Sequence, residues 1–368
     1  MKILRVIFLI KAVINLKSIQ HNFEILKTNT DSKICAVIKA DAYGHGLVQV
    51  AKALTQADCF GVARPCEAFE LRDAGISNDI LILGGYDNQS NLNELISRNI
   101  IISIHSKDEL KFLIKAAKNY DGRIRVHLKI DSGMHRLGIQ NKKELIEILD
   151  SIALTQNIKS QGIYTHYSTS DSDSDYLQEQ YRTFCDITDI INIKKHSANS
   201  AAIFCDKKYH MDMVRAGIML YGYIGNDNIK TKDGKVLSKT LMPAMSITSD
   251  IVQIKTIDSG SFVGYDKGYK SDKTVKIAII SSGYGDGYPR LNNAGYVIIN
   301  NKRCNILGKV CMDSTIVDIT LAGKVTIKDK ALILGENLGA DVIARWNNTI
   351  SYDILCAVKK RVQKEWIL

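Results

Sequence analysis

Residue types that could do acid–base or covalent chemistry stand at the ends of short apolar runs. Lys39 follows the run at residues 35–38, His166 lies at the end of another, and Ser200 follows a third. An amine held partly neutral by nearby cations can form a Schiff base, and a hydroxyl beside backbone amides can hold an anion. Taken singly, such a lysine is more often a surface residue and such a histidine a core residue. Whether these residues do chemistry therefore depends on the secondary-structure elements that position them.

Between residues 33 and 222, apolar runs alternate with amphipathic stretches, which is typical of repeated βα units around a parallel sheet. Eight runs can be counted, at residues 33–39, 59–64, 80–85, 100–105, 123–131, 160–167, 194–199 and 211–222. Eight repeats in roughly 200 residues fit a closed (β/α)₈ TIM-like barrel better than an open doubly wound sheet.

The fifth run is charged on one face. Arg125, His127, Lys129 and Asp131 alternate with aliphatic residues. In a barrel coated by helices this face points into the lumen, where ions must be paired. The alternative is a solvent-facing edge strand of an antiparallel sheet. The count of eight units favours the lumen.

In a barrel enzyme, the C-terminal ends of the strands meet at one mouth, where the active site is built. The side chains and amides that would gather there belong to Lys39, Arg136, His166, Asn199, Ser200, Arg215, Gly217 and Ile218. A hydroxyl after strand seven and amides after strand eight suit a phosphate, and a lysine suits an aldehyde. Together they predict a site for pyridoxal phosphate.

After Leu237 the sequence changes to β-branched runs broken by Gly, Asn and Asp. We expect a second, mostly-β domain. The predicted division is residues 1–235 for the barrel and 236–368 for the β domain, with the extreme N-terminal strand as a candidate to join the latter.

Eight ordered blocks of the sequence are similar to those of one enzyme family. They are AVIKADAYGHG (36–46), KIDSGMHRLG (129–138), HSANSA (196–201), MVRAGI (213–218), GY (264–265), GYGDGYPR (283–290), GKVCMD (308–313) and TISY (349–352). Over nearly its whole length the chain resembles bacterial alanine racemases, which are pyridoxal-phosphate enzymes of fold type III.

The resemblance implies roles for single residues. Lys39 would bind the cofactor as a Schiff base and serve one face of the planar adduct, and Tyr265 of a second subunit would serve the other. His166 would link Arg215, which faces the pyridine nitrogen, to that tyrosine. Further cofactor contacts are implied for Tyr43, Asn199, Ser200, Gly217, Ile218 and Tyr352. The substrate carboxylate would meet Arg136, Met312 and Asp313, and Lys129 would be a candidate for carbamylation.

Two positions depart from the family pattern. Asp266 stands where a glycine commonly follows the tyrosine, so the loop there is expected to differ in shape. His135 replaces a small or amide residue before Arg136. Neither change removes a catalytic group.

Composition narrows the function classes. The net charge is +10, but the basic residues are scattered rather than interleaved with aromatics, which disfavours a nucleic-acid binder. Eight cysteines without a C-x-x-C pair indicate a reducing compartment and no structural zinc. No run of 18 apolar residues exists, so we expect a cytoplasmic protein without a membrane span.

The leading hypothesis is a homodimeric alanine racemase that supplies D-alanine for peptidoglycan. Two alternatives stay open. One is a broad-specificity amino-acid racemase of the same fold, because a pocket discriminates one methylene weakly. The other is a noncatalytic pyridoxal-phosphate-binding protein, although proteins of that barrel-only kind lack a β domain with Tyr265 and Met312.

Overall fold

The computed structural model describes residues 9–86, 89–226 and 228–368. Residues 1–8, the start of the expected N-terminal strand, lie outside the described residues. By its contacts the chain divides into two compact units. Of the described residues, those within 19–42 and 46–242 form the barrel unit, and those within 9–18, 43–45 and 243–368 form the β unit.

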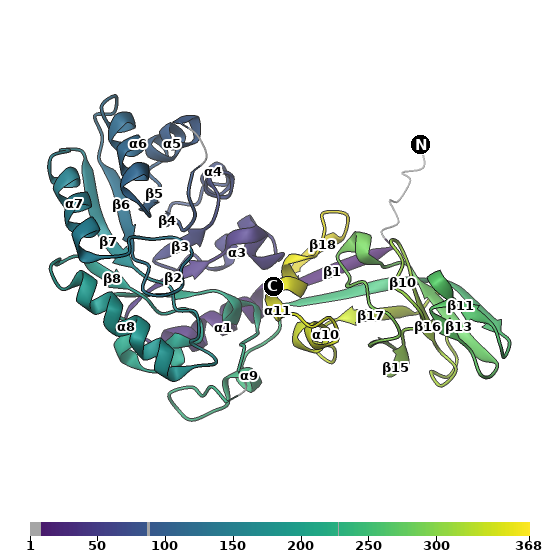
Figure 1. The fold of residues 1–368 in the computed structure, drawn as a ribbon. Coiled ribbons are helices and arrows are strands. Elements are labelled where there is room, and N and C mark those ends of the chain that lie inside the picture. The colour runs from purple at the N-terminus through teal and green to yellow at the C-terminus, as the bar shows by residue number, and fades with distance from the viewer. Residues whose placement is uncertain (1–8, 87–88, 227) are drawn as a thin grey trace. The chain divides into compact units, whose positions relative to one another are not determined.

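Within the described residues, eight parallel strands close into a barrel, which confirms the predicted fold class (Figure 1). The first strand, β2, pairs with both β3 and the last strand, β9. The strands are β2 (Lys33–Val37), β3 (Cys59–Val62), β4 (Asp79–Ile82), β5 (Ile101–Ile104), β6 (Ile124–Lys129), β7 (Ile158–Tyr164), β8 (Lys194–His196) and β9 (Met213–Ala216). Each of the eight predicted runs contains or overlaps one of them.

Helices surround the barrel and bury their apolar faces against it. Several begin at a side-chain cap: Ser106 accepts a hydrogen bond from the Glu109 amide, and Asn141 accepts one from Glu144. The helices are α1 (Leu16–Asn29), α3 (Leu47–Ala53), α4 (Pro65–Asp73), α5 (Gln89–Ser97), α6 (Lys107–Ala117), α7 (Lys142–Ala153), α8 (Ser174–Thr188) and α9 (Leu237–Thr240). Short 3₁₀ turns η1 (Ala202–Phe204), η2 (Lys207–Tyr209) and η3 (Ile218–Tyr221) flank β8 and β9.

Strand β6 is the predicted charged strand, and it is not an edge strand. It pairs in parallel with β5 on one side and β7 on the other. His127 and Lys129 are buried, and Arg125 donates to the Asp79 carboxylate at 2.6 Å. The charged face is therefore not on a sheet edge, and Arg125 and His127 have partners there, Asp79 and His196.

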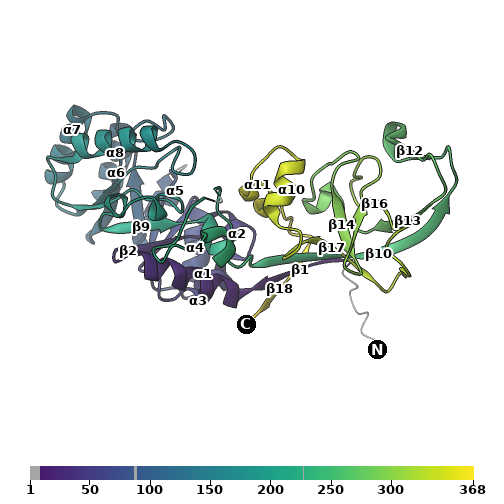
Figure 2. The ribbon, with the colours of Figure 1, turned by 90° about the horizontal axis from the view of Figure 1, so that it is seen from below.

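The β unit is built around the long strand β10 (Met245–Ile257), seen in both ribbon views (Figures 1 and 2). β1 (Ile10–Asn15) pairs antiparallel with β10 and parallel with β18 (Gln363–Ile367). β10 also pairs with β17 (Lys330–Leu334) and β13 (Val275–Ile280). The remaining elements are β11 (Phe262–Val263), η4 (Tyr265–Lys267), β12 (Tyr269–Lys270), η5 (Tyr284–Asp286), β14 (Tyr296–Ile299), β15 (Lys302–Asn305), β16 (Thr315–Asp318), α10 (Ala340–Trp346) and α11 (Ser351–Cys356).

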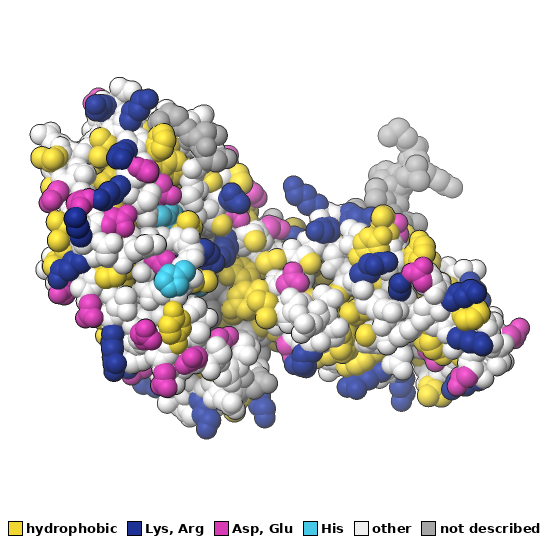
Figure 3. All heavy atoms as spheres, in the orientation of Figure 1, with side chains coloured by type: hydrophobic (Ala, Val, Ile, Leu, Met, Phe, Trp, Pro, Cys, Tyr) yellow, Lys and Arg dark blue, Asp and Glu magenta, His cyan; other side chains and the backbone are white. Residues whose placement is uncertain are grey.

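The visible surface carries basic and acidic side chains side by side (Figure 3). This mixing agrees with the scattered charges of the sequence. Among the described residues, no helix is both long enough and apolar enough to cross a bilayer.

Candidate active site

The chain takes a left-handed turn directly after Lys39. Ala40, Asp41, Ala42 and Tyr43 all have φ between 53° and 55° within α2 (Lys39–Tyr43). This left-handed conformation costs roughly 1–2 kcal/mol for each residue that is not glycine. Such strain persists only where the surroundings determine the backbone, and it concentrates at functional sites.

Two carboxylates hold this turn in place. Glu67 accepts from the Ala40 amide at 2.6 Å with one oxygen and from the Ala63 and Arg64 amides with the other. Asp41 accepts from the Leu47 amide at 2.8 Å, at the start of α3. Glu67 was not among the predicted site residues. The available signal was its place two residues after Pro65, where an acid can bond backbone amides before a helix.

Arg215, in β9, is buried and surrounded by neutral acceptors. Its Nη1 donates to His196 Nδ1 and to the His196 carbonyl, both at 3.0 Å. Its Nη2 donates to the carbonyls of Thr165 at 2.5 Å and Ser197 at 3.1 Å. These contacts occupy the four Nη hydrogens. Among the described residues, the Nε–H is the Arg215 donor without a partner.

Arg215 also sets the tautomers of two lumen histidines. Because a guanidinium only donates, His196 Nδ1 must accept, so its proton lies on Nε2. That proton is donated to His127 Nδ1 at 2.9 Å. Both rings are therefore neutral. Burial, with Arg215 nearby, lowers the pKa of His196, and burial lowers that of His127 to about 4.

Four cations converge around His166, which is partly buried at the end of β7. Burial lowers the pKa of His166 well below its ordinary value, and so do the surrounding charges of Arg215, Arg136, Lys129 and Lys39. Lys129 is itself buried, and burial together with Arg136 and Arg215 lowers its pKa to about 8. The predicted mouth residues of the barrel thus share one strongly positive region.

The loops after β8 and β9 meet at Ser200. The Gly217 amide donates to Ser200 Oγ at 2.9 Å, and the Met219 amide approaches the same atom at 3.5 Å. Asn199 fixes the loop, because its Oδ1 accepts from Ser170 Oγ at 2.7 Å and from the Ala202 amide at 3.1 Å. The Ser200 hydroxyl is thereby brought next to the Gly217 amide and near that of Met219, while the predicted role of the Ile218 amide stays a prediction.

In the β unit, Tyr43 lies beside Tyr352, and their ring centroids are 5.9 Å apart. Burial and the neighbouring Tyr352 raise the pKa of Tyr43, so its hydroxyl keeps its proton. Gly44, with φ of 82°, is required here because a Cβ would lie 2.4 Å from the Leu355 carbonyl oxygen. Two phenols from distant parts of the sequence are thus placed together.

Tyr265 stands at the tip of the β11–β12 hairpin. The residue is 62% exposed. Gly264, Asp266 and Lys267 around it all have positive φ. The backbone of this tip, rather than side-chain packing within the β unit, sets where the phenol lies.

The Met312 turn is held on both sides. The Tyr284 amide donates to the Cys311 carbonyl at 3.1 Å, and the Gly285 amide donates to the Met312 carbonyl at 2.8 Å. Among the described residues, the Met312 amide itself donates to no acceptor. Met312 is 52% exposed. The turn therefore presents an available N–H on a fixed backbone.

Asp313 does not stand free beside Met312. Its Oδ1 accepts from Arg361 Nη2 at 2.6 Å, while Arg361 Nε donates to buried Asp286 at 2.6 Å. Asp286 in turn accepts from the Gly283 amide at 2.9 Å. Arg361 thus ties together the two turns that shape the Met312 amide, a role that sequence reasoning missed.

His135, the second departure from the family pattern, contributes its backbone to the turn before Arg136. Its side chain is exposed, while its amide donates to Asp131 at 2.9 Å. The Gly133 amide donates to the same carboxylate at 3.1 Å. This turn holds the segment that leads to Arg136.

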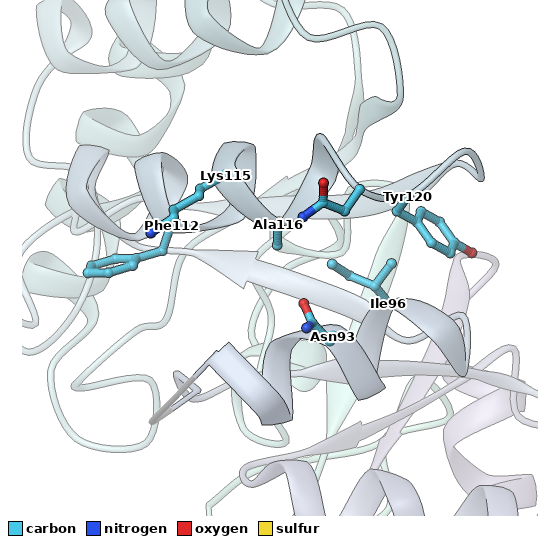
Figure 4. Close-up of a pocket in the computed structure, with 7 residues that line it drawn as sticks. Asn93, Ile96, Phe112, Lys115, Ala116 and Tyr120 are labelled. Carbon is cyan, nitrogen blue, oxygen red and sulfur yellow. The ribbon is translucent and has the colours of Figure 1, made fainter.

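A hollow also lies on the outer helical layer of the barrel unit, between α5 and α6 (Figure 4). It is lined by Asn93, Ile96, Phe112, Lys115, Ala116, Asn119 and Tyr120. None of the predicted site residues contributes to it, so it is a separate feature of the surface.

Comparison with known proteins identifies relatives over the whole chain. A family model described as the alanine racemase N-terminal domain matches residues 14–225, and one for the C-terminal domain matches residues 244–366. An alanine racemase of Halothermothrix orenii is 36% identical over 96% of both chains. Among solved structures, an alanine racemase of Clostridium difficile 630 is 34% identical with a TM-score of 0.89, covering 99% of this chain and 97% of its own. The biosynthetic alanine racemase of Pseudomonas aeruginosa is 30% identical with a TM-score of 0.89, covering 98% and 100%.

Proposed function

The chain belongs to the alanine racemase family, and we propose that it interconverts L-alanine and D-alanine with Lys39 and Tyr265 as its acid–base groups. The observation that carries this assignment is a pair of preorganised groups at the ends of barrel strands: buried Arg215, held by four acceptors, and Ser200 Oγ, which accepts from the Gly217 amide. A fixed guanidinium suits a ring nitrogen, and a hydroxyl beside a backbone amide suits a phosphate.

Racemisation requires two different acid–base groups, because a proton leaves one face of the α-carbon and another arrives on the opposite face. Lys39 is proposed to serve one face from the barrel. Tyr265 is proposed to serve the other, from a second subunit of a homodimer with shared sites. The exposure of Tyr265 supports this assignment, since a catalytic phenol offered to a partner must protrude from its own chain.

The residues present fit pyridoxal phosphate. Ser200 Oγ lies beside the Gly217 amide, which suits a phosphate, and we propose that Ile218, Asn199, Tyr43 and Tyr352 complete its site. When bound, the cofactor supplies an electron sink that acidifies the α-proton of the amino acid.

Arg215 is proposed to face the ring nitrogen with its remaining Nε–H. The Nη hydrogens are already bonded to carbonyls and His196, so the guanidinium is oriented before any ligand arrives. A guanidinium donates and does not give up its proton, which keeps the ring nitrogen unprotonated and limits side reactions. Neutral His166 is proposed to couple this charge to Tyr265, whose phenol must lose a proton to act as a base.

Arg136 and the Met312 amide are proposed to hold the substrate carboxylate, with Asp313 acting through Arg361. We further propose that Lys129 is carbamylated. Its lowered pKa enlarges the neutral fraction that reacts with CO₂. The resulting anion would accept from Arg136 and orient it.

The test is a panel of L-amino acids incubated with the purified protein and analysed on a chiral column. D-Alanine as the main product supports the assignment, and comparable turnover of larger amino acids would replace it with a broad-specificity racemase. Borohydride reduction should fix the pyridoxal label on Lys39. A colourless protein that takes up no pyridoxal phosphate would overturn the cofactor assignment.

The physiological role is proposed to be the supply of D-alanine for peptidoglycan in the cytoplasm. Deletion of the gene should make growth depend on added D-alanine. Growth without the supplement in a strain with no other racemase would contradict this role.

A further inference from the structure

The departure at Asp266 lies next to Tyr265, in the five-residue tip between β11 and β12. Asp266 adopts φ of 55° and ψ of 28°, a left-handed conformation that a glycine takes without steric cost. The chain therefore keeps a glycine-like backbone at a position where it carries a charged side chain. The left-handed backbone at this position is one that a glycine would also adopt, and the carboxylate is what the substitution adds.

The added carboxylate has a specific partner. Asp266 Oδ2 lies 2.5 Å from Lys309 Nζ, and Lys309 holds the pKa of Asp266 below its usual range. The Lys309 side chain is 27% exposed, against 73% for Asp266, so one end of the pair is largely sheltered. Lys309 belongs to the segment that continues to Met312.

A second contact ties the same tip to the same segment. Asn293 Nδ2 donates to the Gly268 carbonyl at 2.5 Å, and the Gly308 amide donates to Asn293 Oδ1 at 2.6 Å. The two backbones lie close, because a Cβ on Gly308 would lie 2.8 Å from the Val263 carbonyl oxygen. Below the tip, Val263 packs with Val275, Ile277 and Leu307. The base of the hairpin is thus anchored by apolar packing and its tip by polar contacts.

We propose that the Asp266–Lys309 ion pair positions Tyr265 and couples its turn to the Met312 segment. The inference rests on the proposed role of Tyr265. Since Tyr265 is largely exposed in its own chain, its position depends on this backbone turn, and the ion pair restrains the turn at the residue after the phenol. Asp266 and Lys309 are positioning residues, because they act through Tyr265 rather than on substrate.

The matched test uses Asp266→Gly, Asp266→Asn and Lys309→Met in the full-length protein loaded with cofactor. Glycine and asparagine both tolerate the left-handed backbone, so these variants remove the charge without adding strain. Exposed ion pairs contribute modestly, so we expect kcat for alanine to fall about two- to five-fold in each variant. With Asp266→Gly and Asp266→Asn, KM should change little because Arg136 and the Met312 amide are untouched.

Three comparisons separate positioning from general stability. The charge-swapped double variant Asp266→Lys/Lys309→Asp should recover most of the lost kcat. Hydrogen exchange over residues 262–270 should quicken in Asp266→Gly while β6 stays protected. Asp272→Asn removes an exposed carboxylate of the same unit that forms no ion pair among the described residues, and it should leave kcat unchanged.

Equal or higher kcat in Asp266→Gly, or no recovery in the swapped variant, would overturn the inference. An inactive wild-type protein would instead overturn the proposed function. The two failures are therefore distinguishable in the same assay.

Discussion

The barrel unit and the β unit hold their functional groups by different means. In the barrel, Arg215 is buried and bonded to four acceptors, and its neighbouring histidines are fixed in one tautomer. In the β unit, Tyr265 and Met312 are more than half exposed and are placed by turns of the backbone. The barrel groups are thus organised by contacts within their own unit, whereas the exposure of the β-unit groups is what the proposed dimer with shared sites requires.

The largest expected effect tests that division directly. Lys39→Ala and Tyr265→Phe should each be nearly inactive, since loss of an acid–base group lowers rates about 10²- to 10⁴-fold. Mixing the two chains should restore about a quarter of the wild-type activity, because half of the dimers are mixed and each has one intact site. No recovery after confirmed subunit exchange would place both groups in one chain.

A second prediction compares stability in the two units. Arg215→Met leaves several buried acceptors without a donor and should lower the free energy of unfolding by about 2–4 kcal/mol. Tyr265→Phe alters an exposed side chain and should change it by less than about 0.5 kcal/mol. Urea denaturation of both variants measures the contrast, and similar losses would show that the tip of the hairpin is as tightly held as the lumen.

The neutral histidines predict a pH dependence specific to the barrel. The folded-state pKa of His127 is about 4, below its ordinary value of 6.5. The unfolded chain therefore takes up a proton first, and stability falls as pH drops from 6.5 towards 4. For this group alone the loss at pH 4 is about 3 kcal/mol.

His127→Gln keeps an acceptor for His196 but does not titrate, so it should show a shallower decline in unfolding free energy over this range. Denaturation of both proteins at pH 7 and pH 4.5 measures it. An unchanged slope would mean that His127 is protonated in the folded lumen.

The smallest effect concerns the Met312 turn. Arg361→Met removes the donor shared by Asp286 and Asp313, and we expect KM for alanine to rise about ten-fold because the turn loosens. Arg361→Lys keeps the charge but cannot bond both carboxylates in the same planar geometry. Its KM should therefore lie between that of the wild type and that of Arg361→Met. Steady-state kinetics of the three proteins measure these KM values. An unchanged KM together with a lower melting temperature would mean that Arg361 has only a structural role.

The features that could be predicted from the sequence are those that produce a pattern among neighbouring residues. The barrel strands were predictable because apolar runs recur at regular intervals, and the charged face of β6 showed the alternation of a strand. Lys39, His166 and Arg215 could be predicted to share one mouth because the ends of barrel strands meet there.

The parts that were not visible depend on contacts distant in the chain. Arg361 is 48 residues from Asp313 and 75 from Asp286, and Glu67 is 27 from Ala40. Neither contact produces a periodic pattern in the sequence. The left-handed turn after Lys39 also could not be predicted, because no glycine precedes Gly44 in it and tertiary contacts override the preference of Ala40 and Ala42 for negative φ.

That turn has a consequence for protein chemistry. A D-amino acid favours the left-handed backbone conformation that Ala40 and Ala42 adopt. A semisynthetic chain with D-alanine at these two positions should therefore fold with Lys39 unmoved and with less stored energy. The proposed product of the enzyme would then be the residue best suited to support the amine proposed for its catalysis.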